Sequence, residues 1–264
     1  MWLTGKLAPD HKTIADFRRD NGPAIQAACA HFVVLCRGIG LFTHLIVAHD
    51  VIMTGSDRQQ LAAMSGKARA SMGVERLEVL ADRGYFSGEE IVACEAIGVT
   101  PYVPKPLTSG AKADGRFGKQ DFVYVTEQDV YRCPAGHHLR YHMTTVEKGL
   151  TLHRYWDQPS CASCALKPQC TLSKMRRVTR WEHEAVIDAM QRRMDLAPQS
   201  PMKLRRKLVE HPFGTIKSWT GSSHFLMKRL ANVKTEISLH VLAYNLKRVV
   251  QILGVRPLMA AIQA

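Results

Sequence analysis

The chain has 264 residues, of which 36 are Lys or Arg and 23 are Asp or Glu, so its formal net charge is +13. This excess of positive charge favours a polyanionic partner such as nucleic acid, although an ordinary basic soluble protein can share the composition. No run of 18 apolar residues occurs, and the N-terminal MWLTGKLAPD lacks a signal-peptide pattern, so we expect neither a membrane span nor export. We therefore expect a cytoplasmic protein whose seven cysteines are reduced thiols or metal ligands rather than disulfides.

Residues 9–41 have the pattern of two helices. Thr13 is placed to cap the first helix, the Asn21-Gly22 pair to break it, and Pro23 to open the second. Two short helices with basic residues on the first are either a small DNA-binding unit or a plain helical hairpin.

The next segment alternates between strand-like and helix-like patterns, which is typical of a parallel α/β sheet. Ser87 and Glu90 have the spacing of a capping box, which predicts the start of a helix that stops at Gly98. The prolines of the last strand confine it to an edge or a strand end. We expect strands at 44–52, 76–82 and 99–106, and helices at 55–73, with Ser56 or Asp57 as the cap, and at 87–98.

A cysteine cluster follows, within a loop-rich region that also contains short strand-like runs. Four thiolates from two short segments suit a tetrahedral structural Zn²⁺, although an iron–sulfur cluster or four unligated thiols also fit. The proposed ligands are Cys133, Cys161, Cys164 and Cys170. A histidine can replace one of them, and the candidates are His137, His138 and His153. The remaining cysteines lie on apolar helical stretches and are expected to be packing residues: Cys29, Cys36 and Cys94.

After residue 181 the pattern is helical again, and Gly254 is expected to end the long segment TEISLHVLAYNLKRVVQILG. The basic stretch 174–195, which contains Trp181, can track a DNA backbone or form a solvated helix face. If it binds phosphates, added salt should weaken the binding steeply.

Two acidic residues, Asp82 and Glu210, are candidates for a functional site. Asp82 follows a strand directly, where functional groups gather in parallel α/β sheets, although it can equally cap the turn that contains Gly84. Glu210 lies four residues after Arg206 and seven before Lys217, so on a helix the three share a face. The Arg206–Glu210 pair is also compatible with a solvated salt bridge, and Pro212 is expected to kink or restart the helix.

Several phrases resemble the DDE transposases of bacterial insertion sequences: ADRGYFSGEEI, VEHPFGTIKSW and EISLHVLAYNLKRVVQILG, together with the N-terminal WLTGKLAPDHKTIADFRRDN. The resemblance implies a ribonuclease-H-like fold in which two Asp residues and one Glu converge. It assigns the second Asp to Asp82 and the Glu to Glu210. Arg206 and Lys217 match the basic residues that would hold DNA phosphates, whereas Lys203 stands where a Tyr is common in the family.

In such enzymes two Mg²⁺ or Mn²⁺ ions, about 4 Å apart, activate the nucleophile and stabilise the leaving oxygen in strand cleavage and transfer. The resemblance therefore implies double-stranded DNA as partner, both the terminal inverted repeats of the element and the target. It also implies a homo-oligomer assembled on that DNA.

One expected element is missing from the sequence. No Asp-Gly strand lies between the N-terminal helices and residue 44, so the chain resembles an internally shortened family member without the first acid. Asp50 and Asp57 are the conceivable substitutes, of which Asp57 is expected to cap the following helix. Without a third ligand, two-metal catalysis should be impaired. The alternatives are a catalytically silent DNA-binding remnant and an unrelated metal-dependent nuclease that uses Asp50, Asp82 and Glu210.

We thus predict an α/β protein with an incomplete ribonuclease-H-like core, from which the first strand is missing, a cysteine-rich insertion and flanking helices. The predicted parts are an N-terminal helical segment, the first part of the core, the insertion, and a C-terminal helical part that carries Glu210. Their boundaries are 1–42, 43–106, 107–180 and 181–264.

Overall fold

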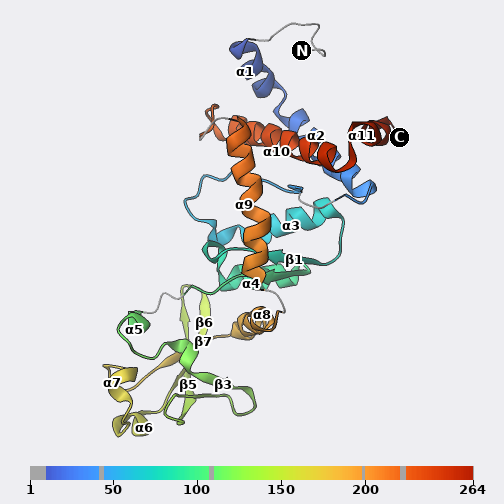
Figure 1. Ribbon diagram of the computed structural model, residues 1–264. Coiled ribbons are helices and arrows are strands. Elements are labelled where there is room, and N and C mark those ends of the chain that lie inside the picture. Colours follow the sequence, from blue (N-terminus) through green and yellow to red (C-terminus); the bar gives the residue numbers. More distant parts are fainter. Residues whose placement is uncertain (1–9, 42–44, 107–109, 198–199, 221–223, 264) are drawn as a thin grey trace. The chain divides into compact units, whose positions relative to one another are not determined.

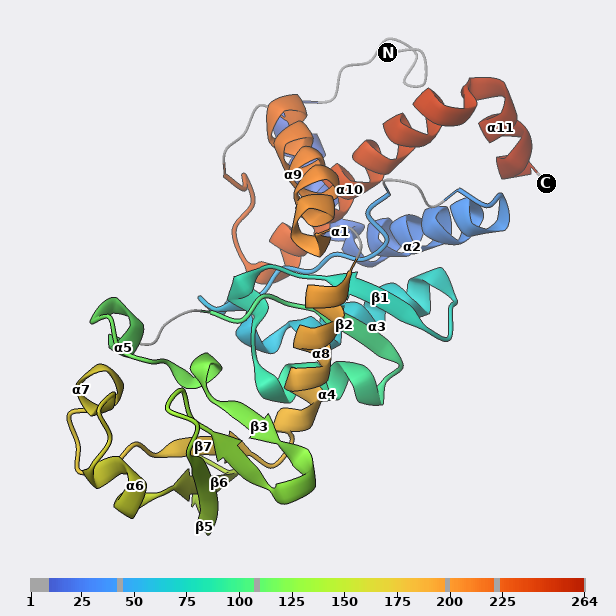
Figure 2. The ribbon, with the colours of Figure 1, turned by 60° about the horizontal axis from the view of Figure 1, so that its bottom comes forward.

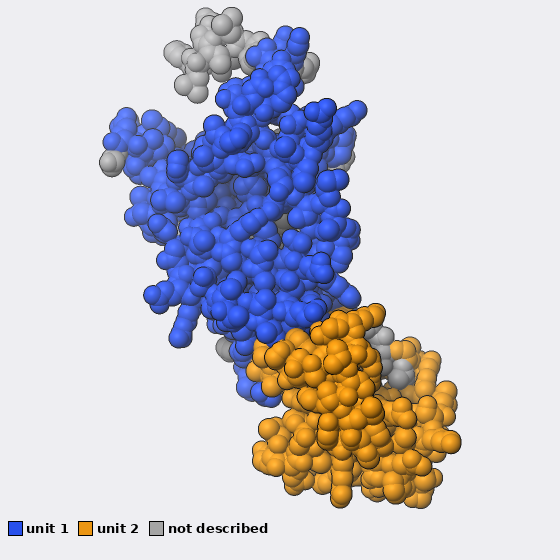
Figure 3. All heavy atoms as spheres, turned by 180° about the vertical axis from the view of Figure 1, so that it is seen from behind, with its two compact units in different colours: residues 1–104, 192–264 blue, residues 105–191 orange. Residues whose placement is uncertain are grey.

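The computed structural model describes residues 10–41, 45–106, 110–197, 200–220 and 224–263, with backbone alone at some helical positions. The chain divides into two compact units (Figure 3). Unit 1 comprises Met1–Pro104 and Arg192–Ala264, and unit 2 comprises Lys105–Gln191. Helices and sheets occur together, which confirms the mixed α/β class.

The predicted N-terminal helices are present in unit 1 as α1 (His11–Asp20) and α2 (Gly22–Gly38). Asp10, rather than Thr13, caps α1, because its carboxylate accepts a hydrogen bond from the Thr13 backbone N–H at 2.7 Å. Helix α2 packs against α10 (Leu230–Leu253) (Figure 1). The contact is close, since a Cβ at Gly22 would lie only 2.7 Å from Thr235 Oγ1. The side chains that α2 buries are Ile25, Cys29, Val33 and Cys36.

Unit 1 contains a two-stranded parallel sheet of β1 (Leu77–Leu80) and β2 (Val99–Tyr102). These strands confirm two of the three that the sequence predicts. Helices α3 (Leu61–Met72) and α4 (Gly88–Ala96) pack against the pair (Figure 2), and short 3₁₀ turns precede α3 and α4. These turns are η1 (Asp57–Gln59) and η2 (Arg83–Tyr85). The apolar side chains buried in this part are Leu61, Ile91, Cys94, Val99 and Val103.

The predicted strand at 44–52 is wrong over its described residues, because residues 45–52 pair with no strand. Side chains of α10 hold this segment instead. Asn245, which is 2% exposed, accepts a hydrogen bond from Ile46 N–H and donates one to the Ile46 carbonyl, both at 2.9 Å. The segment thus has the β-branched composition of a strand, but its neighbour is a helix instead of another strand.

The capping box predicted at Ser87 is also wrong. Ser87 is the N-cap residue of α4, but its side chain makes no capping hydrogen bond. The Glu90 carboxylate instead accepts a hydrogen bond from the Ala62 N–H at 2.9 Å, at the start of α3. Glu90 therefore satisfies a free N–H of another helix, which spacing along the chain does not predict.

The C-terminal part is helical, as predicted. After α8 (Glu184–Leu196), helix α9 (Pro201–Thr220) continues through Pro212, so the restart expected at that proline is absent. Gly254, with φ of +83°, ends α10 as predicted, and α11 (Val255–Gln263) begins at once. None of the helices in the described part of the chain is both long and apolar enough to cross a membrane.

Unit 2 is built on a five-stranded antiparallel sheet in sequence order. Its strands are β3 (Val123–Val125), β4 (Val130–Arg132), β5 (His138–Glu147), β6 (Leu150–Trp156) and β7 (Val178–Trp181). Short helices flank the sheet: α5 (Gly110–Ala113), α6 (Gln158–Ala162) and α7 (Lys167–Cys170), with 3₁₀ turns η3 (Lys119–Asp121) and η4 (Thr126–Gln128). One face of the sheet carries Tyr131, Leu139, Tyr155 and Val178, and Phe122 joins them in the core of the unit.

Candidate functional site

Asp82 lies just beyond β1, separated from the end of the strand by Ala81. Its Oδ1 accepts a hydrogen bond from the Gly84 N–H at 2.9 Å, so Asp82 caps the turn η2. A Cβ at Gly84 would stand 3.0 Å from this oxygen, which explains why a glycine suits the turn. The carboxylate is 46% exposed, so capping leaves it open to a further partner.

That partner is Arg205, a residue that the sequence analysis did not identify. Its Nη2 lies 3.0 Å from Asp82 Oδ2, and Arg205 belongs to α9, which packs beside β1 (Figure 1). The helix predicted to carry Glu210 therefore lies next to β1, the strand that precedes Asp82. No local pattern predicts the pair, since its members are 123 positions apart.

Glu210 lies on α9, but its side chain is outside the described residues. The meeting of the Asp82 and Glu210 carboxylates, and their binding of one divalent ion, stay predictions. The basic residues assigned to DNA phosphates are on the same helix and exposed: Lys203, Arg206 and Lys217. Exposure leaves their cationic groups accessible to a phosphate backbone.

Asp50, one conceivable substitute for the first acid, already has two cationic partners. Lys67 contacts one of its oxygens, and Lys234 Nζ lies 2.8 Å from the other. The Lys234 and Lys67 ammonium groups hold the pKa of the Asp50 carboxyl well below its ordinary value. Because the carboxylate is 20% exposed and neutralised by two lysines, it is not a free metal ligand.

Asp57, the other conceivable substitute, is exposed at the start of η1. The capping role expected for it is wrong, because Ser56 supplies the N-cap side chain and accepts from Arg58 N–H at 3.4 Å. Burial, followed by the charges of Asp57 and Asp82, raises the pKa of the Tyr85 hydroxyl. The turns η1 and η2, which Asp57 begins and Asp82 caps, also contact each other, and the sequence did not predict this contact.

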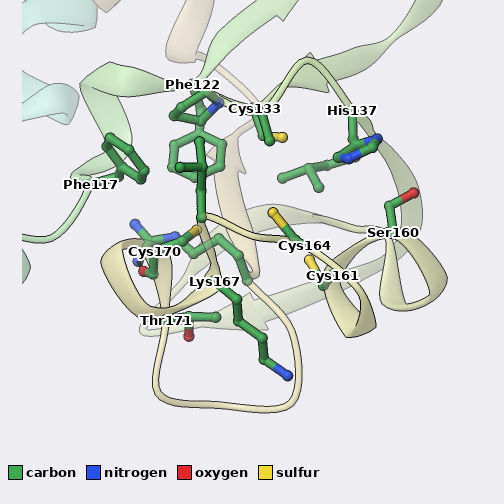
Figure 4. Close-up of a pocket in the computed structure, with 15 residues that line it drawn as sticks. Phe117, Phe122, Cys133, His137, Ser160, Cys161, Cys164, Lys167, Cys170 and Thr171 are labelled. Carbon is green, nitrogen blue, oxygen red and sulfur yellow. Dashed lines mark hydrogen bonds between the residues drawn. The ribbon is translucent and has the colours of Figure 1, made fainter.

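The four clustered cysteines of unit 2 line one pocket (Figure 4). Cys133 lies in the turn between β4 and β5, where its N–H donates to the His137 carbonyl at 2.9 Å. The others lie at or just after the short helices α6 and α7, and Figure 4 shows all four around the same space. The spacing of the cysteines thus identified residues that share a pocket.

The electrostatics of this pocket connect the four thiols. Burial raises the pKa of the Cys170 thiol, and the charges of the other three cysteines raise it further, whereas Arg176 lowers it. Among the described residues, however, no group of three or more His, Cys, Asp or Glu side chains is arranged to hold a metal ion. Of the candidate histidines only His137 lines this pocket. Zinc therefore stays a prediction.

The other three cysteines are buried in unit 1, as expected for packing residues: Cys29, Cys36 and Cys94.

Residues 132–250 match the family model described as "Transposase DDE domain". This match implies a ribonuclease-H-like fold and a DNA partner. Comparisons with curated proteins and with solved structures gave no match. The matched segment includes Glu210 and its basic neighbours, and it also includes the four clustered cysteines. Over residues 132–250, the chain is therefore similar to the DDE transposases.

Proposed function

We propose that the chain binds the ends of a transposable element as a transposase-family protein whose metal-dependent strand cleavage is impaired. The observation that carries this proposal is the pairing of Asp50 with Lys67 and Lys234. The acid at the end of the 45–52 segment would otherwise be the natural replacement for the missing first acid. Removing it from its lysines would leave two ammonium groups without a counter-ion, which opposes its use as a metal ligand.

Asp82 and Glu210 would hold the divalent ion, since Mg²⁺ and Mn²⁺ prefer carboxylate oxygens. When bound, such ions activate a nucleophile and stabilise a leaving oxygen in phosphoryl transfer. Arg205 neutralises Asp82 at 3.0 Å and would have to release it to an ion. An exposed ion pair of this kind contributes about 0–1 kcal/mol, so a divalent cation can displace the guanidinium at modest cost.

Arg206, Lys217 and Lys203 would bind the phosphates of double-stranded DNA, both at inverted repeats and at a target. Their exposure on α9 supports this role, as does the net charge of +13. A protein with these contacts and no third acid would recognise element ends, and pair there with further copies, without cutting them. Such a protein is the catalytically silent DNA-binding remnant, in which the impairment of cleavage is complete.

A second candidate function, active cleavage, is favoured by the contact between η1, which begins at Asp57, and η2, which Asp82 caps. In that case Asp57 would take the place of the first acid.

One experiment separates the two functions. The full chain is incubated with DNA that carries the terminal inverted repeats, in Mg²⁺ or Mn²⁺, and both retention of the duplex and strand cleavage are measured. Impaired function predicts retention with little or no cleavage in the wild type and in the Asp57→Asn variant alike. Turnover at ordinary transposase rates that the Asp57→Asn and Asp82→Asn variants lose would establish the active enzyme instead. Loss of duplex retention would contradict both.

We also propose that the cysteine pocket of unit 2 binds a structural Zn²⁺. Support comes from the donor set, four thiols, and from the single pocket that they line. A zinc ion would offset the mutual repulsion of neighbouring thiolates and would stabilise the loops around the pocket.

A further inference from the structure

The face of the unit 2 sheet opposite its core carries an unusual combination of exposed basic and aromatic side chains. Register places Arg132 opposite His138 and Arg140 opposite Trp156, so these four share one face. The buried residues Leu139 and Tyr155 alternate with them and point to the other face. We call this surface the basic aromatic face, and it consists of Arg132, His138, Arg140, His142, Trp156 and Arg177.

A stack of planar groups lies at the centre of the basic aromatic face. The His142 ring is parallel to the Trp156 ring, with centroids 4.0 Å apart and an interplanar angle of 5°. The Arg177 guanidinium also lies over the Trp156 ring, 5.3 Å from its centroid. A hydrogen bond at 3.1 Å between His142 Nε2 and the Trp156 carbonyl fixes the imidazole. His142 is exposed, so the imidazole surface turned away from Trp156 is available for another planar group.

The charge around this stack is positive and unpaired. None of the three arginines of the face forms an ion pair with any residue that the structure describes. A pocket with both polar and apolar lining borders the stack, and it includes Arg140, His142 and Trp156. Its single acid is Asp157, whose oxygens accept hydrogen bonds from the Ser160 hydroxyl and N–H at 2.6 and 3.5 Å, at the start of α6.

We propose that the basic aromatic face binds a single-stranded nucleic acid, with a base stacked on His142 and phosphates held by Arg140 and Arg177. Strand binding without sequence preference combines these two elements, a cationic surface that follows the backbone and aromatic rings that stack bases. In duplex DNA both faces of each base are covered by its neighbours, so a duplex could use only the arginines. The stack therefore favours an unpaired strand. This site lies in unit 2, goes beyond the proposed function, and does not depend on strand cleavage.

The test measures binding of the full chain to fluorescein-labelled oligo(dT), oligo(U) and a mixed-sequence duplex of equal length by fluorescence anisotropy over a range of salt. The informative variants are His142→Ala, His142→Phe and Arg140→Ala. Lys148→Gln is the matched charge control, because Lys148 is an exposed cation of the same unit in the turn between β5 and β6. Circular dichroism establishes that each variant retains the wild-type fold.

We expect His142→Ala to weaken binding of the single strand about tenfold, the contribution of one stacked base, and to leave duplex binding unchanged. His142→Phe should retain affinity within about twofold, because its ring still stacks. Arg140→Ala should lower the slope of log affinity against log salt by about 0.7, as for one lost phosphate contact on a single strand. The proposal is overturned if His142→Ala binds the single strand as tightly as the wild type, or if His142→Ala and His142→Phe lose the same affinity. It is also overturned if Lys148→Gln changes the salt slope as much as Arg140→Ala does. Because duplex retention at element ends is measured separately, failure here leaves the proposed function standing.

Discussion

Replacing Asn245 by Ala tests how the extended segment 45–52 is held without a neighbouring strand. Lys234, Ser238 and Asn245 of α10 each bind a residue of this segment. Their positions are four and seven residues apart, so the three side chains lie on one face of the helix. Asn245 supplies both an acceptor and a donor to the backbone of Ile46 at 2.9 Å, as a strand neighbour would. The variant loses both hydrogen bonds and leaves a partly buried N–H and carbonyl without their partner.

Each lost hydrogen bond removes about 0.5–1.5 kcal/mol, and an unsatisfied buried group costs about 1–3 kcal/mol. Because Ile46 is only partly buried and water can reach it, we expect Asn245→Ala to lower the free energy of unfolding by about 2–4 kcal/mol. Tm should fall by about 5–10 °C for a domain of this size. Unfolding is followed by far-UV circular dichroism, since the long helices α9 and α10 belong to unit 1.

The control is Asn232→Ala, on the first turn of α10, where the side chain has no hydrogen bond to a described residue. We expect this control to change stability by less than about 0.5 kcal/mol apart from helix propensity. An Asn245→Ala variant no less stable than Asn232→Ala would refute the argument that α10 substitutes for a strand.

Three further predictions concern individual groups. Burial lowers the pKa of His49, whose Nε2 lies 2.8 Å from the Ser238 hydroxyl. The contribution of neutral His49 to stability is therefore present above about pH 6.5 and is lost as the pH falls. The Tm of His49→Gln should depend less on pH between 7 and 5 than that of the wild type, and an unchanged dependence would contradict this. The pKa of Asp50 is lowered, so its contribution to the free energy of unfolding is present above about pH 4 and is lost in more acidic solution. Asp50→Asn should lower the free energy of unfolding, measured by urea titration, by about 1–2 kcal/mol at pH 7, and this difference should narrow below pH 4. If zinc occupies the cysteine pocket, elemental analysis should find one ion per chain, and Cys161→Ser should lose it and lower Tm, whereas metal-free wild-type protein would disprove the site.

Much of the fold follows from short-range signals. Asn21-Gly22 separates two helices, Gly254 ends α10, and the apolar runs before Asp82 and after Gly98 form β1 and β2. In each case the deciding information lies within a few residues: a φ above zero, a turn pair or a buried apolar run.

Long-range partners explain what the sequence did not predict. Residues 45–52 have strand composition, but a strand needs a neighbour, and here α10 takes that place. Glu90 has capping-box spacing but binds the N–H of Ala62, 28 residues away. Arg205 and its contact with Asp82 carry no local signal, because the contact depends on the packing of α9 beside β1. The cysteines were identified by spacing alone, since ligand spacing is itself a short-range pattern.

The most direct test of the central claim, that the set of catalytic acids is incomplete, is electron paramagnetic resonance of Mn²⁺ added to the full chain on inverted-repeat DNA. A complete two-metal site holds ions about 4 Å apart, which gives a spin-coupled Mn²⁺ pair. The account predicts no coupled pair, and at most one weakly bound Mn²⁺ that the Asp82→Asn variant releases. A coupled pair in the wild type, lost in Asp57→Asn or Asp82→Asn, would contradict it.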